Sequence, residues 1–169
     1  MQRCLLATFL FSLVLVVSAN AGGFKANTGT ADNIEVTSDR LDVFSDKRES
    51  VFRGNVEATK GDIRLNCGVL HLFLDEKTHK VDKLVAEEDV KIFWQDRQAS
   101  CSKATYLLAE DKIIMTGNVI ITRGKEMLSA DKVVFDMKSK HQVVEGNEKS
   151  RVKIKVETDK ETGILKWEH

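Results

Sequence analysis

The chain is 169 residues long, which predicts a single domain. Its 26 lysines and arginines balance 26 aspartates and glutamates, and this argues against a nucleic-acid binder because such proteins carry a basic excess. A neutral chain can still hold an anionic lipid through the lipid's tails. The sequence contains no proline, which suits uninterrupted strand ladders.

The first 21 residues have the pattern of a secretory signal peptide. An apolar run over residues 4–17 is followed by residues 18–21 (SANA), which place small side chains where a signal peptidase cuts. We expect cleavage after Ala21, followed by a flexible polar arm over residues 22–33. The alternative is a retained membrane anchor, but the apolar run is shorter than the roughly 20 residues that span a bilayer.

The rest of the chain contains an internal repeat. Residues 54–61 (GNVEATKG) recur as residues 117–124 (GNVIITRG) with five of the eight residues identical, a weaker copy covers residues 88–93, and Gly146-Asn147 is a degenerate fourth copy. A repeat that cannot bury its own apolar face must stack on its neighbours. Such a protein works through an extended surface or groove more often than through a few catalytic side chains.

A second element in each unit switches its apolar positions from one parity to the other. The switch falls at Ser38, Cys67, Cys101 and Ala130, which are spaced by 29, 34 and 29 residues. Alternation indicates a strand with one buried face, and a parity switch indicates a bulge or bend that keeps the same side inward. The inward residues on these elements are Ile34, Val36, Leu41, Val43, Ile63, Leu65, Leu70, Leu72, Leu74, Ala99, Ala104, Tyr106, Leu108, Leu128, Val133, Phe135 and Met137.

The glycine-bearing strands alternate as well. Gly54 and Gly117 fall on the inward parity, where glycine indicates a corner or a close backbone approach. The pattern predicts an all-β body over residues 34–156, a repeat-built open β-jellyroll of stacked antiparallel strands folded over like a taco. Residues 152–156 are expected to form the last strand, and residues 157–169 a charged C-terminal tail. Each open end of such a stack has an edge strand that must be capped or paired.

Several motifs resemble those of a known family. They are Phe52-Arg53-Gly54-Asn55-Val56, Ile114-Met115-Thr116-Gly117-Asn118-Val119 and Ser129-Ala130-Asp131-Lys132-Val133-Val134, with an opening strand that begins at Ile34. Their order and spacing, together with the signal peptide, are similar to those of the OstA-like periplasmic lipopolysaccharide transport proteins. The resemblance covers residues 34 to about 156.

The resemblance implies a non-enzymatic lipid carrier in the periplasm without a cofactor. Its apolar trough would shield the acyl chains of lipopolysaccharide, and units would join head to tail into a bridge between the membranes. Partners would be related β-jellyroll domains of the inner- and outer-membrane components, and a cytoplasmic ATPase would supply the energy. The positions that match lipid-facing strands are Ile34, Val36, Phe52, Val56, Val90, Ile92, Met115, Val119 and Ile121, to which we add Trp94 as a candidate that can equally be plain core packing.

Two features depart from the pattern. The middle copy has Glu88 and Asp89 where the others have glycine and asparagine, so a carboxylate falls on the inward parity unless Glu88 lies at the rim. Cys67 and Cys101 share the column of parity switches, so either a disulfide or two buried thiols is possible.

Other functions find less support. His71, His79, His141 and His169 have no ligand spacing, so we expect no metal site. No G-x-S-x-G nucleophile motif occurs, so we expect no hydrolase. The inward residues can also be the closed core of a β-sandwich. A membrane-anchored delivery partner with the same fold, and a structural β-solenoid without lipid cargo, remain as alternative functions.

Overall fold

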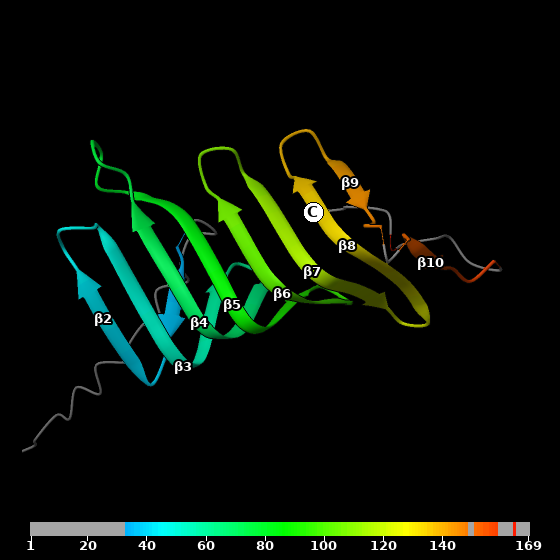
Figure 1. Ribbon diagram of the computed structural model, residues 1–169, viewed down its shortest axis with the longest axis horizontal. Coiled ribbons are helices and arrows are strands. Elements are labelled where there is room, and N and C mark those ends of the chain that lie inside the picture. Colours follow the sequence, from blue (N-terminus) through cyan, green and yellow to red (C-terminus); the bar gives the residue numbers. More distant parts are fainter. Residues whose placement is uncertain (1–32, 149–150, 159–163, 165–169) are drawn as a thin grey trace, which may run out of the picture.

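The computed structural model describes residues 33–148, 151–158 and 164 and forms one twisted antiparallel sheet (Figure 1). The predicted all-β fold is confirmed. The described strands are β1 (Glu35–Thr37), β2 (Arg40–Phe44), β3 (Glu49–Lys60), β4 (Ile63–Leu74), β5 (Val81–Trp94), β6 (Arg97–Leu107), β7 (Lys112–Arg123), β8 (Glu126–Asp136), β9 (His141–Glu145) and β10 (Lys153–Lys155).

The strands are stacked in chain order. Each strand from β3 to β8 pairs antiparallel with the next along the chain. The two ends of the sheet are built alike, because two short strands share one long neighbour at each end. At the first end β1 and β2 both pair with β3, and at the other end β9 and β10 both pair with β8. The predicted strand over residues 152–156 is therefore present as β10, at an edge of the sheet.

The long strands bend where sequence parity predicts a bend. Two consecutive residues with positive φ interrupt β3 (Gly54-Asn55), β5 (Glu88-Asp89) and β7 (Gly117-Asn118), and the pairing register shifts at each of these bulges. The extra residue of each bulge thus lies in β3, β5 or β7, and the parity switches of β4, β6 and β8 lie opposite these bulges. A bulge of this kind increases the local bend of a strand.

The aligned bulges divide the sheet into two walls. The upper wall, which carries the turns at the top of Figure 1, contains residues 40–53, 69–87, 103–116 and 132–145. The lower wall contains residues 35–37, 56–66, 90–100, 119–129 and 153–155. The hairpin turns of the lower wall and the turns of the upper wall form two opposing rims.

At each bulge one glycine leaves room for a side chain of a neighbouring segment. A Cβ on Gly117 would lie 2.7 Å from the Ser102 Oγ atom, and a Cβ on Gly54 would lie 2.6 Å from the Asp39 Oδ2 atom. In the middle copy the roles are exchanged, because a Cβ on Gly68 would lie 2.5 Å from the Glu88 Oε2 atom. One member of each opposed pair must lack a side chain, and this explains why the middle copy tolerates glutamate.

The Glu88 carboxylate therefore does not enter the space between the walls. Its residue is exposed and has a φ of 67°. Of the two positions that the sequence left open for Glu88, the structure has the exposed one, because the bulge rotates the residue away from the alternating pattern. The first and last copies of the repeat share a further feature. The side-chain amides of Asn55 and Asn147 donate hydrogen bonds to the carboxylates of Asp39 (2.8 Å) and Asp131 (2.8 Å) respectively.

The apolar side chains form columns that cross the whole stack. One column on the lower wall contains Val36, Ala58, Leu65, Ile92, Ala99, Ile121, Leu128 and Ile154. A matching column on the upper wall contains Leu41, Phe52, Leu70, Ala86, Ala104, Met115, Val133 and Val144. The central members of both columns belong to one hydrophobic cluster. The core is thus the space between the two walls.

Candidate lipid-binding trough

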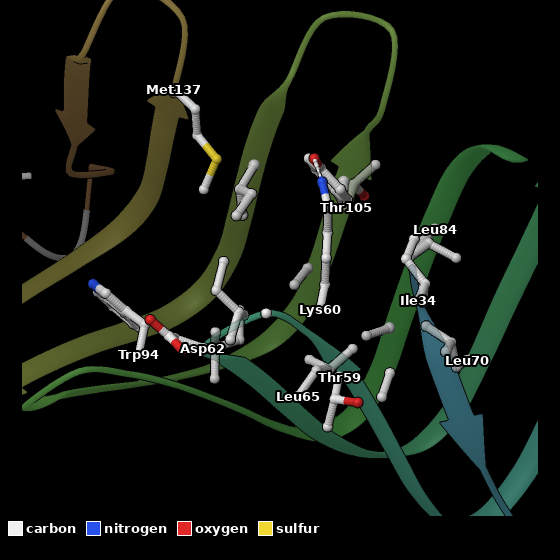
Figure 2. A pocket seen from close by; sticks show the side chains of 18 of the residues that line it. Ile34, Thr59, Lys60, Asp62, Leu65, Leu70, Leu84, Trp94, Thr105 and Met137 are labelled. Carbon is white, nitrogen blue, oxygen red and sulfur yellow. Dashed lines mark hydrogen bonds between the residues drawn. The ribbon is translucent and has the colours of Figure 1, made fainter. Parts of the chain in front are cut away.

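A cavity of about 370 Å³ lies between the walls, chiefly over β3 to β6 (Figure 2). Its size is at the lower end of the range for small-molecule pockets, roughly 300–1,000 Å³. The lining is mainly aliphatic and aromatic and comes from both walls. The apolar lining residues are Ile34, Ala58, Ile63, Leu65, Leu70, Leu84, Ala86, Ile92, Trp94, Ala104, Tyr106, Ile113 and Met137.

The cavity reaches the surface at its rims. Gly61 and Asp62, in the turn between β3 and β4, both line it and are exposed. Leu65 and Ile63 are half-buried beside this turn. The interior of a closed β-sandwich would have no such exposed lining, so the structure has a lateral mouth between the rims.

The ten predicted lipid-binding residues divide into two groups. Ile34, Ile92 and Trp94 line the cavity, and Met115 lines a small adjoining gap of about 10 Å³. The other six lie in the hydrophobic cluster or pack against it without lining the cavity. These are Val36, Phe52, Val56, Val90, Val119 and Ile121.

Two contacts between side chains of opposite walls lie at the cavity. The rings of Trp94, on the lower wall, and Phe135, on the upper wall, meet edge to face with their centroids 6.5 Å apart. The second contact is polar and joins Lys60, at the end of β3, to Tyr106 on β6. The Lys60 Nζ atom donates to the Tyr106 hydroxyl at 2.8 Å, and this hydroxyl donates to the Asp111 carboxylate at 2.7 Å.

The lysine also lies against the aromatic face of the same tyrosine. Its Nζ atom is 5.0 Å from the Tyr106 ring centroid, which adds a cation–π attraction. Burial raises the pKa of the Tyr106 hydroxyl, and the Asp111 carboxylate acts in the same direction, while Lys60 opposes them. The hydroxyl is therefore protonated at neutral pH and can donate to Asp111 while it accepts from Lys60.

Burial at the bends also raises the pKa of both described cysteines. Cys67 and Cys101 are free thiols, and each pKa is raised from 9.0 to about 11 chiefly by desolvation. They lie on β4 and β6 with β5 between them. Of the two states that the sequence left open, the structure contains the pair of buried thiols.

One residue of the C-terminal tail reaches the core. Ile164 is 4% exposed and belongs to the hydrophobic cluster. Its backbone N–H donates to the buried Glu126 carboxylate at 3.0 Å. The apolar side chain of Ile164 in a charged tail is a signal that it can dock, but the sequence does not identify Glu126 as its partner because the two residues are 38 apart.

Within the described ranges, no group of three or more histidine, cysteine, aspartate or glutamate residues could hold a metal ion. No helix in the same part of the chain is long and apolar enough to cross a membrane.

Sequence reasoning missed part of the lining. It gave Leu65, Leu70, Tyr106 and Met137 the inward parity but did not place them at the site, because parity cannot tell a packed position from one that faces a cavity. Leu84 and Ala86 were not singled out. Leu84 and Ala86 fall at alternate positions of β5, and this alternation could have indicated that they face inward.

Both ends of the sheet expose apolar side chains. On β2, Leu41, Val43 and Phe44 are exposed, and at the other end Val152, Ile154 and Val156 are exposed on and beside β10. An edge strand with exposed apolar side chains is a template for pairing with another strand.

Comparisons with known proteins agree with this architecture. The profile of the family "LptA/(LptD N-terminal domain) LPS transport protein" matches residues 35–141 and 98–163. A solved structure with a similar fold is LptH from Pseudomonas aeruginosa, described as the LptA homologous periplasmic component of the conserved lipopolysaccharide transport device. It superposes with a TM-score of 0.64 at 13% identity, over 74% of this chain and 95% of that one. A search of curated proteins found no match.

Proposed function

This chain belongs to the LptA/LptD N-terminal domain family of lipopolysaccharide transport proteins, and we propose that it carries lipopolysaccharide across the periplasm as a bridge component that performs no catalysis. A role in lipopolysaccharide transport follows from family membership. The trough between the walls would shield the acyl chains, and the sugar and phosphate groups would stay in water outside the mouth. The observation that carries the proposal is the apolar cavity with exposed rims.

The energetics favour such a site for acyl chains. Each CH₂ group removed from water contributes about 0.8 kcal/mol. The apolar columns continue beyond the cavity from β4 to β8, so an acyl chain that moved along them as the walls part would exchange one apolar neighbour for another. A path without a deep minimum suits a carrier that must release its cargo.

The two exposed edges support head-to-tail assembly. β1 and β2 at one end, and β10 at the other, are each paired on one side only, and β2 and β10 carry exposed apolar side chains. Pairing of the last strand of one unit with the first strand of the next would continue both the sheet and the trough. The same edges would meet the related domains of the inner- and outer-membrane components.

We propose that the protein is located in the periplasm, after its signal peptide is cleaved following Ala21. The signal peptide over residues 1–21 and the arm over residues 22–33 lie outside the described residues, apart from Asn33, and stay predictions. The mass of the exported protein tests them, because a retained N-terminus would instead favour a membrane-anchored delivery partner.

The function is tested by a charge in the trough. Leu65 lines the cavity and is half-buried, so Leu65→Asp should place a carboxylate in the trough near the mouth. Lys91→Asp introduces the same side chain at an exposed position of the neighbouring strand. We expect Leu65→Asp to weaken binding of purified lipopolysaccharide at least about tenfold, the effect of leaving a few CH₂ groups exposed. Equal binding by both folded variants would refute the proposal.

A further inference from the structure

The polar contact between Lys60, Tyr106 and Asp111 spans the mouth of the trough. Lys60 is the last residue of β3 and precedes the exposed turn at Gly61 and Asp62 on the lower rim. Asp111 lies in the turn between β6 and β7 on the upper rim. The contact therefore joins the two rims, and we call these three residues the clasp.

The clasp lies obliquely over the cavity. It starts on β3 and ends on β6, three strands further along the sheet, or about 14 Å at the usual strand spacing. Figure 2 shows the Lys60 side chain extended across the cavity, with its nitrogen near the strand that carries Thr105. Each member of the clasp also lines the cavity. A lipid that enters laterally over these strands must pass it.

The cavity is small for a lipid with several acyl chains. Its 370 Å³ lies at the lower end of pockets that hold one small ligand. The walls are joined beside it by the clasp and further along by Trp94 and Phe135. A wider cargo thus requires the walls to part, and parting them over these strands breaks the hydrogen bond between Lys60 and Tyr106.

The chemistry of the clasp suits a reversible contact. Its three residues are half-buried, so when the walls separate the Lys60 Nζ atom and the Tyr106 hydroxyl can exchange their mutual hydrogen bond for water, while Tyr106 and Asp111 stay paired on the upper wall. In the closed arrangement the hydroxyl joins a cation to a carboxylate, and hydrogen bonds to charged groups are stronger than those between neutral ones. A purely apolar contact at the same place would be continuous with the lipid path and would not distinguish a narrow cargo from a wide one.

We propose that Lys60, Tyr106 and Asp111 set the width of the trough, so that a single acyl chain binds with the clasp closed and a lipid with several chains binds only when it opens. This inference rests on the proposed lipid-carrying function. The clasp residues would select lipids by their width, and Tyr106 is the residue that connects the two rims.

The test combines binding with a distance across the mouth. Spin labels at Asp62→Cys and Glu110→Cys report the separation of the rims, because both positions are exposed on opposite sides of the mouth. The labels leave Cys67 and Cys101 unmodified because these thiols are buried. Palmitate serves as the single-chain probe and purified lipopolysaccharide as the wide one. The mature full-length chain is used throughout.

We expect lipopolysaccharide to lengthen the distance between the labels and palmitate to leave it unchanged. Tyr106→Phe keeps the ring but removes the hydroxyl, and should lengthen or broaden the distance before lipid is added. It should also tighten binding of lipopolysaccharide roughly three- to tenfold, the scale of one partly exposed hydrogen bond, with palmitate binding unchanged. Lys60→Met should act in the same direction, and Lys91→Met, on the exposed face, should change nothing.

The outcomes distinguish a failure of the clasp proposal from a failure of the proposed carrier function. If the unsubstituted protein binds lipopolysaccharide at an unchanged label distance, or if Tyr106→Phe binds both probes as the unsubstituted protein does, the clasp is refuted and the carrier function stands. If the unsubstituted protein and all variants fail to bind lipopolysaccharide, the carrier function itself is refuted, and the clasp with it.

Discussion

The bend at Gly117 offers a quantitative test of how the two walls are formed. Gly117 has a φ of 78°, and a Cβ placed on it would lie 2.7 Å from the Oγ atom and 2.8 Å from the Cβ atom of Ser102. Gly117→Ala therefore has two costs. The left-handed backbone costs about 1–2 kcal/mol for a residue with a side chain, and the contact with Ser102 adds about 1–3 kcal/mol of overpacking.

Gly124→Ala is the matched control. Gly124 also has a positive φ, 57°, but nothing lies within 4 Å of an added Cβ. It should show the backbone cost alone, about 1–2 kcal/mol. Gly117→Ala should thus lower the free energy of unfolding by about 2–5 kcal/mol, and the melting temperature by about 2–4 °C for each kcal/mol in a chain of this size.

A second substitution should restore part of the loss. Ser102→Gly in the Gly117→Ala background moves the glycine to the preceding strand, as in the natural pairing of Gly68 with Glu88. We expect a coupling of about 1–3 kcal/mol between the two sites in urea unfolding, measured as a double-mutant cycle. Equal losses for Gly117→Ala and Gly124→Ala, or no coupling with Ser102→Gly, would refute the view that one side chain must be absent at each bulge.

Two further predictions concern the edges and the buried thiols. Ile154→Glu, at a 44%-exposed residue of β10, should weaken self-association about tenfold or more in sedimentation experiments because an apolar contact is lost. The control Ile120→Glu, at a 40%-exposed residue on β7 inside the sheet, should leave self-association unchanged. Equal effects of the two substitutions would exclude pairing at the β10 edge. Cys67 and Cys101 should resist thiol reagents in the native protein at pH 8, and stability should fall as pH rises from 9 to about 11, because the thiol pKa is raised in the folded state and deprotonation then favours the unfolded chain. The Cys67→Ala, Cys101→Ala double variant should lose that part of the pH dependence, and an unchanged profile would show that other groups cause it.

The sequence predicts the fold well because its information is local and repeated. Alternation fixes which side of a strand is buried, and the parity switches at Cys67 and Cys101 fix where each strand bends to within one residue of the observed bulges. Both signals depend on neighbours within a strand. The repeat then shows that the bends lie in register, and this is sufficient to predict two walls.

The candidate site depends on contacts that local patterns do not contain. The relation between Glu88 and Gly68 depends on strand register, so inward parity alone could not decide where the carboxylate lies. Lys60 and Tyr106 are 46 residues apart and face each other only because the sheet folds over. The division of inward residues between cavity lining and filled core depends on the distance between the walls, as the buried Val119 and the cavity-lining Ile92 illustrate.

A photo-crosslinker placed at successive residues of β5 tests the central claim most directly. Ile92 faces the cavity, whereas its neighbour Lys91 is exposed on the opposite face of the strand. In cells that transport lipopolysaccharide, a crosslinker at Ile92 should capture lipopolysaccharide and one at Lys91 should not. Equal capture at the two positions, or capture at Lys91 alone, would contradict a trough that holds the acyl chains between the walls.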